Sequence, residues 1–111
     1  MELTSTTSGE HMVVSVAGRL DTTTAPELER FCTSQVQSGS NRLILDFQKL
    51  EYISSSGLRA VLASAKMASA SGGKFAVCGL TGPVLEVFRI SSFDSILPVF
   101  ADADAALKGG A

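Results

Sequence analysis

The sequence predicts an α/β fold, because short runs of apolar, often β-branched residues alternate along the chain with segments whose apolar residues recur at helical spacing. A chain of 111 residues, 45% of them hydrophobic, has the usual size of one compact domain and enough apolar surface to bury a core. No repeat or linker divides it. We therefore expect a single domain over residues 1–111, with fraying at the last residues, 109–111.

Composition argues against several classes of function. Nine Lys and Arg residues against eleven Asp and Glu residues give a formal net charge of −2, and the basic residues are scattered singly. This pattern argues against a nucleic-acid-binding surface and against a patch for anionic membranes. The apolar runs are far too short to cross a bilayer, and residues 1–5 do not resemble a signal peptide. We expect a soluble, cytoplasmic protein without membrane insertion.

Two segments in the first half of the chain have the pattern of strands. Residues 12–17 are β-branched and partly alternating, and Leu3 is expected in a short preceding strand joined to them by a turn at residues 8–10. Residues 42–47 contain three consecutive apolar residues, which is typical of a strand buried on both faces. We expect this strand at the centre of the sheet.

Two segments have the spacing of amphipathic helices. One covers residues 25–37, where Thr24 and Glu27 fit a capping box. The other covers residues 57–71 and ends at the glycine pair 72–73, which accepts positive φ angles. Each of the two helices is expected to bury one apolar face.

The last third of the chain continues the alternation. Residues 74–78 predict a strand and residues 81–89 a short helix. Residues 96–100 include a proline and predict an edge strand, because proline cannot donate to a central ladder. The alanine-rich residues 102–108 predict a terminal helix.

Few residues have the pattern of a catalytic or metal site. Cys32 and Cys78 lie in apolar segments without metal-ligand spacing, so buried free thiols are expected. The only histidine, His11, precedes a strand and is expected at a surface or strand edge. Asp46 and Glu51, at a strand end and in the following loop, are expected to cap and to face solvent. Without a phosphate loop, a base or a ligand cluster, we expect no enzymatic activity and no cofactor.

One polar segment stands between a predicted strand and a predicted helix. Ser54, Ser55, Ser56 and Gly57 occupy a helix N-terminus, where free N–H groups and the positive end of the helix dipole favour hydroxyl caps. The same groups favour a phosphate carried by one of the hydroxyls. Local chemistry by itself favours simple capping over modification, because serine is common at this position.

An ordered set of motifs resembles the STAS domain of bacterial anti-sigma factor antagonists. The resemblance covers nearly the whole chain, and the segment that opens the second long helix is its most specific part. The motifs are Gly18-Arg19-Leu20-Asp21, Ala25-Pro26-Glu27-Leu28, Leu43-Ile44-Leu45-Asp46-Phe47 and Tyr52-Ile53-Ser54-Ser55-Ser56-Gly57-Leu58, with Gly72-Gly73 and Val87-Phe88-Arg89-Ile90 in support.

The resemblance implies a fold and a function. The fold would be a small mixed sheet of four or five strands, covered mainly on one face by helices. The unphosphorylated protein would bind an ATP-dependent serine kinase that doubles as an anti-sigma factor, and so free the sigma factor. Phosphorylation would reverse the binding, and a serine phosphatase would remove the phosphate.

Position within the family motif assigns the phosphate to Ser55, although Ser54 replaces the aspartate that commonly precedes the modified serine. Ser56, Gly57 and Leu58 would border the site, with Leu58 supplying apolar surface to the partner, and Asp21 would contribute to the kinase-facing surface or cap the first helix. Other interpretations stay open. One is a STAS-like subunit of a transport or signalling assembly that is never phosphorylated. Another is a small ligand-binding domain or an enzyme with Ser55 as nucleophile, which would lack a base.

Overall fold

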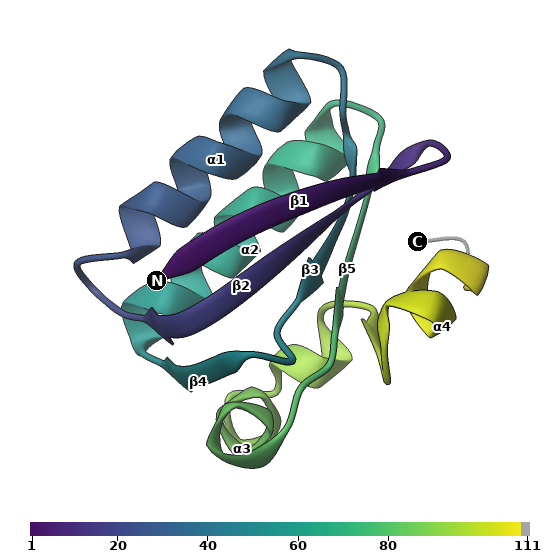
Figure 1. Ribbon diagram of the computed structural model, residues 1–111. Helices are drawn as coiled ribbons and strands as arrows, with labels where there is room; N and C mark the ends of the chain where they lie inside the picture. The colour runs from purple at the N-terminus through teal and green to yellow at the C-terminus, as the bar shows by residue number, and fades with distance from the viewer. Residues whose placement is uncertain (110–111) are drawn as a thin grey trace.

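A mixed β-sheet forms the centre of the computed structural model, which describes residues 1–109 (Figure 1). Its main path runs β1-β2-β3-β5-β6, and a further strand, β4, pairs with the end of β2. β1 and β2 form an antiparallel hairpin, whereas the other pairs are parallel. The strands are β1 (Glu2–Ser8), β2 (His11–Leu20), β3 (Arg42–Asp46), β4 (Leu50–Ile53), β5 (Lys74–Cys78) and β6 (Val99–Phe100).

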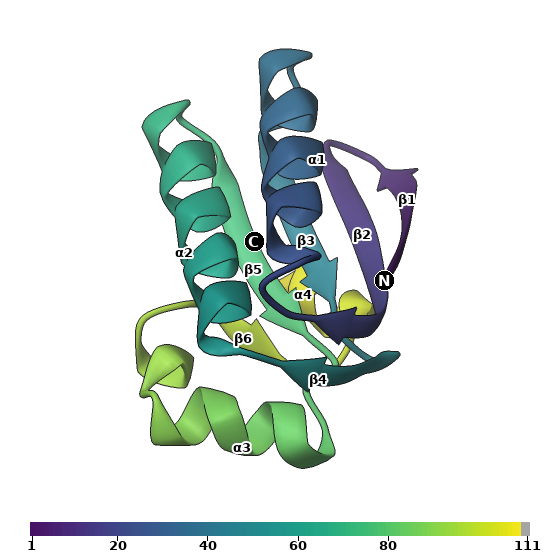
Figure 2. The ribbon, with the colours of Figure 1, turned by 90° about the vertical axis from the view of Figure 1, so that its left-hand side faces the viewer.

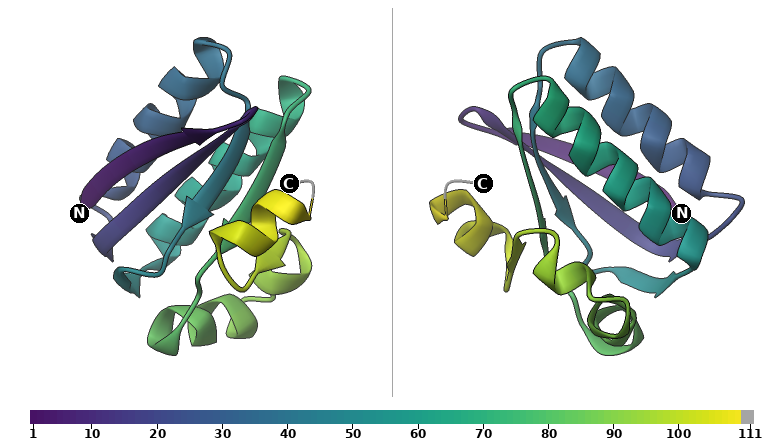
Figure 3. Two further views of the ribbon diagram at one scale, coloured as in Figure 1. Left: turned by 45° about the vertical axis from the view of Figure 1, so that its right-hand side comes forward. Right: turned by 180° about the vertical axis from the view of Figure 1, so that it is seen from behind.

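Helices lie against both faces of the sheet and beyond one of its ends. α1 and α2 run side by side on one face (Figure 2). α4 covers part of the other face, and α3 lies across the end of the sheet near β4 (Figure 3). The helices are α1 (Ala25–Gln37), α2 (Ser55–Ala70), α3 (Gly82–Ile90) and α4 (Ala103–Lys108), and a short 3-10 helix, η1, covers Phe93–Ser95.

The predicted α/β class is confirmed, with the two long helices together on one face. The sheet has six strands rather than four or five. The strand that we did not predict is β4, which contains Glu51 and corrects its placement in a loop. Only Leu50 and Ile53 of β4 are buried, so this strand lacks the alternation by which strands are recognised.

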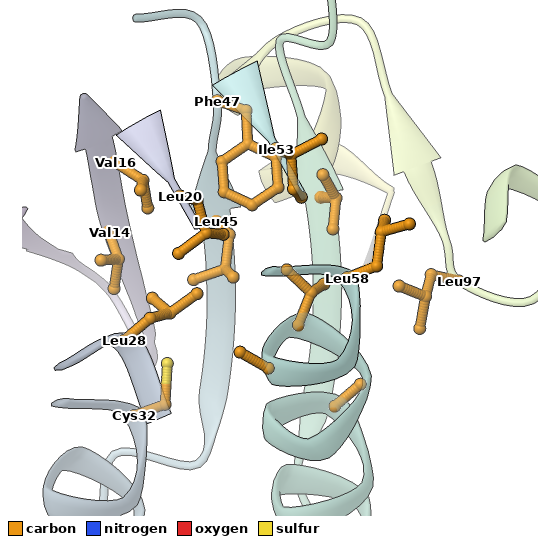
Figure 4. Close-up of a cluster of buried hydrophobic side chains, with 14 of the residues drawn as sticks. Val14, Val16, Leu20, Leu28, Cys32, Leu45, Phe47, Ile53, Leu58 and Leu97 are labelled. Carbon is orange, nitrogen blue, oxygen red and sulfur yellow. The ribbon is translucent and has the colours of Figure 1, made fainter. Parts of the chain in front are cut away.

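β3 is the central strand, as predicted. Leu43, Ile44 and Leu45 are all fully buried. Leu43 and Leu45 belong to the large core between the sheet and the pair α1 and α2 (Figure 4). Ile44 faces the other way, into a small cluster with Ala76, Cys78 and Ala106 of α4. Both faces of β3 are therefore covered.

The terminal segment follows the prediction in part. The Asp102 carboxylate caps α4 by accepting from the Ala105 N–H at 2.8 Å. The predicted edge strand is shorter than expected, because only Val99 and Phe100 pair with β5. Gly109 still donates its N–H to the Ala105 carbonyl, and the rest of the predicted fraying, at residues 110–111, lies outside the described residues.

Both cysteines are buried free thiols, as predicted. Burial raises the pKa of Cys32 to about 11. Burial, together with the charges of nearby carboxylates, raises the pKa of Cys78 to about 12. Both thiols therefore stay protonated at neutral pH and pack as small apolar groups. Within residues 1–109, no helix combines the length and the apolar character that a membrane span requires.

Candidate functional site

The serine segment and the loop after β2 meet at one end of the sheet. Leu20 pairs with Ile53 at the last position of the β2–β4 ladder. Immediately beyond it, the Ser54 N–H donates to the Leu20 carbonyl at 2.9 Å. The start of α2 is therefore attached to the end of β2, and the loop that contains Asp21 lies beside it.

Ser54 is the N-cap of α2. Its backbone is extended, and its hydroxyl accepts a hydrogen bond from the Gly57 N–H at 3.1 Å. Its carbonyl accepts the Leu58 N–H at 2.9 Å, the first bond of the helix. The expectation of a serine cap is confirmed for Ser54, and the helix begins at Ser55, two residues earlier than predicted.

Ser55 and Ser56 occupy different surroundings in the first turn. Ser55 is exposed, and no hydrogen bond within residues 1–109 involves its hydroxyl. Ser56 is half-buried, lies 3.3 Å from the Thr22 hydroxyl and accepts from Nη2 of Arg59 at 3.1 Å. Of the three neighbouring serines, only Ser55 has a hydroxyl that is both open to solvent and without a hydrogen bond in the described structure.

Asp21 organises the loop between β2 and α1. Its Oδ1 accepts from the Thr23 N–H at 3.0 Å, the Thr23 hydroxyl at 2.8 Å and the Thr24 N–H at 3.2 Å. The hydrogen bond from the Thr23 hydroxyl, assisted by the backbone N–H groups and opposed by partial desolvation, lowers the pKa of Asp21. The carboxylate is therefore held ionised. Of the two roles considered for Asp21, a cap of the first helix is not observed, because the carboxylate accepts from Thr23 and from the N-cap residue Thr24 and not from an N–H inside α1. The partner-facing role stays a prediction.

The predicted capping box at the start of α1 is wrong. The Thr24 hydroxyl makes no cap to the helix; it donates to the Arg19 carbonyl at 2.8 Å and accepts from the Asp21 N–H at 2.8 Å. The Glu27 N–H instead donates to the Thr24 carbonyl. The Thr24 hydroxyl is therefore held by backbone groups on the upstream side of α1 and does not reach the Glu27 N–H.

Gly57 and Leu58 turn toward the core. A Cβ on Gly57 would lie 2.7 Å from the Leu20 carbonyl oxygen, so only glycine allows α2 to approach β2 this closely. Leu58 is 7% exposed and points into the core (Figure 4). The expectation that Leu58 offers apolar surface to a partner is therefore wrong, because its position on α2 faces the sheet.

An aromatic side chain provides the apolar surface near this end instead. Tyr52 of β4 is 39% exposed, and the Arg19 guanidinium lies 4.1 Å from the centre of its ring. Nε of Arg19 also lies 3.8 Å from Oδ2 of Asp21. Sequence reasoning did not select Arg19, Thr22 or Tyr52, although Arg19 and Tyr52 stand in the family motifs, next to Asp21 and just before the serines.

The other residues considered for chemistry lie elsewhere. His11 begins β2, at the opposite end of that strand from the serines, and its buried Nε2 has no hydrogen-bond partner in the described part of the chain. Asp46 accepts from the Gln48 N–H at 3.0 Å, the expected capping role, and Glu51 is exposed. Residues 1–109 contain no group of three or more His, Cys, Asp or Glu residues that could hold a metal ion.

Comparison with known proteins establishes the class. The chain belongs to the STAS domain family, whose model matches residues 2–106. It is similar to BtrV of Bordetella bronchiseptica, a protein named as a candidate anti-sigma factor antagonist. The two are 39% identical over 106 residues, which span 96% of this chain and 91% of BtrV.

Solved structures share the fold. An anti-sigma factor antagonist from Mycobacterium paratuberculosis superposes with a TM-score of 0.87 at 26% identity, over 98% of this chain and 92% of the other. The phosphorylated form of SpoIIAA, a cell fate determinant of Bacillus, superposes with a TM-score of 0.73 at 18% identity, over 96% and 98% of the two chains. At that identity the likeness to SpoIIAA shows the fold alone.

Proposed function

We propose that this protein is an anti-sigma factor antagonist whose binding to its partner is switched by phosphorylation of Ser55. The unphosphorylated protein binds, in the cytoplasm, an anti-sigma factor that is also an ATP-dependent serine kinase, and so frees the sigma factor. The kinase transfers the γ-phosphoryl group of ATP to the Ser55 hydroxyl, and the complex separates. A serine phosphatase later hydrolyses the phosphate ester and restores the binding form.

The observation that carries this proposal is the state of the three neighbouring hydroxyls. Ser55 is exposed and unbonded within the described structure, so a kinase reaches it without breaking any hydrogen bond. The Ser54 hydroxyl is already used as the cap that accepts from the Gly57 N–H, and Ser56 is engaged by Thr22 and Arg59. The register taken from the family motif and the geometry therefore favour the same serine.

The negative charge of the phosphate is what changes partner binding in this proposal. A phosphate adds a charge of about −1.5 to −2 at neutral pH. The whole chain has a formal net charge of −2, so this addition concentrates a comparable charge at one point of the docking surface. The N-terminus of α2 favours an anion, so the modified fold stays stable. A partner that packs around a small hydroxyl beside the ionised Asp21 is then repelled.

The names of relatives agree with this function. BtrV is 39% identical over nearly the whole chain, and the Mycobacterium paratuberculosis protein is also named as an anti-sigma factor antagonist. SpoIIAA is described in a phosphorylated form, so the same fold exists with phosphate attached.

Two alternatives make different predictions. A STAS subunit of a transport or signalling assembly would take no phosphate. An enzyme with Ser55 as nucleophile would hydrolyse esters, although the only histidine begins β2 at the far end of that strand. Ester turnover that Ser55→Ala abolishes would favour this enzyme and contradict a module without catalytic activity.

The test uses the full chain with ATP and a small serine kinase encoded beside its gene. Intact-mass measurement should show one added phosphate on wild type and none on Ser55→Ala. Ser55→Ala should still bind the kinase, whereas Ser55→Asp should weaken binding only in part, because one carboxylate carries less charge than a phosphate. Ser69→Ala, which removes an exposed hydroxyl near the other end of α2, is the matched control.

Phosphopeptide mapping separates the remaining outcomes. If phosphate persists in Ser55→Ala and disappears in Ser54→Ala or Ser56→Ala, the phosphorylated residue is the neighbouring serine and the assignment to Ser55 is wrong. Equal affinity of the kinase for the modified and unmodified protein would contradict the switch itself.

A further inference from the structure

A groove lies along the edge of the sheet farthest from β1, remote from the serine segment. Its volume is about 440 Å³, and its lining comes from the C-terminal half of α2, the start of β5 and the chain just before β6. Figure 2 shows how α2, β5 and β6 are arranged. The lining residues that matter for its chemistry are Leu62, Lys66, Lys74, Phe75, Ile96 and Pro98.

The sheet edge beside this groove is incomplete. β6 pairs with β5 only at Val77 and Cys78, and the Val77 N–H donates to the Pro98 carbonyl at 2.9 Å. Because alternate residues of a strand direct their peptide groups to the same side, the N–H and C=O of Phe75 face this edge as well. β6 does not pair with Phe75, and no backbone hydrogen bond joins either group to a loop or turn of the described structure.

The sequence before β6 explains why the ladder stops there. Continuing the parallel register would require the residue at position 98 to donate an N–H to the Phe75 carbonyl, and proline has none. Ile96 has helical backbone angles, φ −97° and ψ −37°, so its carbonyl is not part of a strand. The peptide groups of Phe75 are therefore left for another strand to use.

The side chains around this open edge combine apolar surface with positive charge. Ile96 is 57% exposed, which is unusual for a large apolar residue of this chain. Among residues 1–109, the charged residues that line the groove are Lys66 and Lys74. The groove is thus locally basic in a protein whose formal net charge is −2.

We propose that this groove binds an extended, acidic segment of a partner protein. The segment adds to the sheet edge by pairing its main chain with the N–H and C=O of Phe75. It places an apolar side chain against Leu62 and Ile96, and carboxylates beside Lys66 and Lys74. This surface is separate from the serine segment, because Lys66 lies eleven positions after Ser55 on α2, roughly 16 Å along the helix axis.

The first test selects ligands without assuming a partner. A display library of random octapeptides is panned against wild type, against a double variant Lys66→Glu plus Lys74→Glu, and against a control, Lys49→Glu plus Lys108→Glu. The control also replaces two exposed lysines, so both variants carry the same net charge. Thermal unfolding and backbone NMR spectra establish that both variants are folded.

Wild type and the control should select peptides in which Asp or Glu alternate with apolar residues, and the groove variant should not. A synthetic peptide of the most enriched sequence should shift the amide signals of residues 73–77 and the 96–98 segment. Each single charge reversal in the groove should weaken its binding roughly five-fold at low salt. Two N-methylated forms of the peptide should then differ. Methylation of the alternate amides that face the sheet edge should abolish binding, whereas methylation of the amides that face away should leave binding intact.

Several results would overturn the proposal. They are selection of peptides without acidic enrichment, equal binding to wild type and to the groove variant, and shifts confined to other parts of the protein. Light scattering that shows wild type forming a dimer, with the groove variant monomeric, would assign the edge to a second copy of this chain instead. Because the library contains no kinase and no phosphate, these outcomes do not depend on Ser55.

Discussion

Ser54 and Ser55 carry the same hydroxyl group, but the backbone assigns them different tasks. Ser54 has an extended backbone, and its side chain folds over the first turn of α2 to accept from Gly57. Ser55 already has a helical backbone, so its side chain projects away from the turn into solvent. A difference of one position therefore separates a structural hydroxyl from one that is open to chemistry.

Ser54→Ala should destabilise the protein by about 1 kcal/mol, because the Gly57 N–H loses its acceptor near the protein interior. Ser55→Ala should change the free energy of unfolding by less than about 0.5 kcal/mol, as is usual for an exposed position without a contact. Urea titration of both variants beside wild type measures the difference. Equal losses in the two variants would contradict the assignment of Ser54 as the cap.

Asp21 should make stability depend on pH in the acid range. Its pKa is lowered in the folded state, so the folded protein binds this proton less readily than the unfolded chain does. The stabilisation is present above the unfolded pKa of about 3.9 and is lost as the pH falls through the lower folded pKa. The stability difference between wild type and Asp21→Asn should therefore shrink on acidification below about pH 4.

Thermal unfolding between neutral and acid pH checks this dependence. Asp94→Asn, which removes an exposed carboxylate in η1, controls for the loss of one surface charge. A gap between wild type and Asp21→Asn that stays constant, or widens, as the pH falls would contradict the hydrogen-bonded turn.

β3 contributes buried side chains to both faces of the sheet. Ile44→Ala should destabilise the protein by about 2–5 kcal/mol, because it leaves a cavity between the sheet and α4 where the side chain is fully buried. Val99→Ala, on the half-buried edge strand β6, is the comparison and should cost clearly less. Denaturant titration decides, and a near-zero loss for Ile44→Ala would contradict its central position.

The elements that could be predicted are those whose own residues bury an apolar face. β2, β3 and β5, together with α1 and α2, carry periodic apolar residues, so their positions follow from the sequence. β4 could not be found in this way, because Leu50 and Ile53 are buried at a spacing of three, and its pairing with β2 depends on a distant segment. Tertiary pairing decides such short strands.

Only part of the candidate site could be predicted from the sequence. The cap at Ser54 agrees with the serine-rich start of the predicted helix. The position of Asp21 at the same end of the sheet as the serines agrees with the family resemblance, not with a strand pattern in the sequence. The inward direction of Leu58 could not be predicted, because it depends on how close α2 approaches the end of β2. The Thr24 cap failed for a similar reason: the Thr24 hydroxyl is bonded to the Arg19 carbonyl and the Asp21 N–H, through a loop conformation that the capping-box pattern does not contain.

For the whole molecule, α2 connects two surfaces that differ in chemistry. Its N-terminus presents hydroxyls beside the loop that contains Asp21, whereas its C-terminal half borders the basic groove of Lys66 and Lys74. The helix is packed against the sheet and against α1 along its length, which favours a rigid element over one that melts when charge is added. Partner exchange would then act through surface charge rather than through refolding.

Phosphate on Ser55 should accordingly leave the fold intact. The Ser55 side chain makes no hydrogen bond in the described structure that the phosphate would break, and the helix N-terminus stabilises an added anion by about 0.3–1 kcal/mol when exposed. Phosphoserine placed at position 55 by synthesis, and compared with the unmodified chain, should give amide shifts confined to residues 20–24 and 54–59. Its melting temperature should be equal or slightly higher. Shifts that spread through β3 and β5, or a clear loss of stability, would mean that the switch works by rearranging the fold, and the surface-charge mechanism would then be wrong.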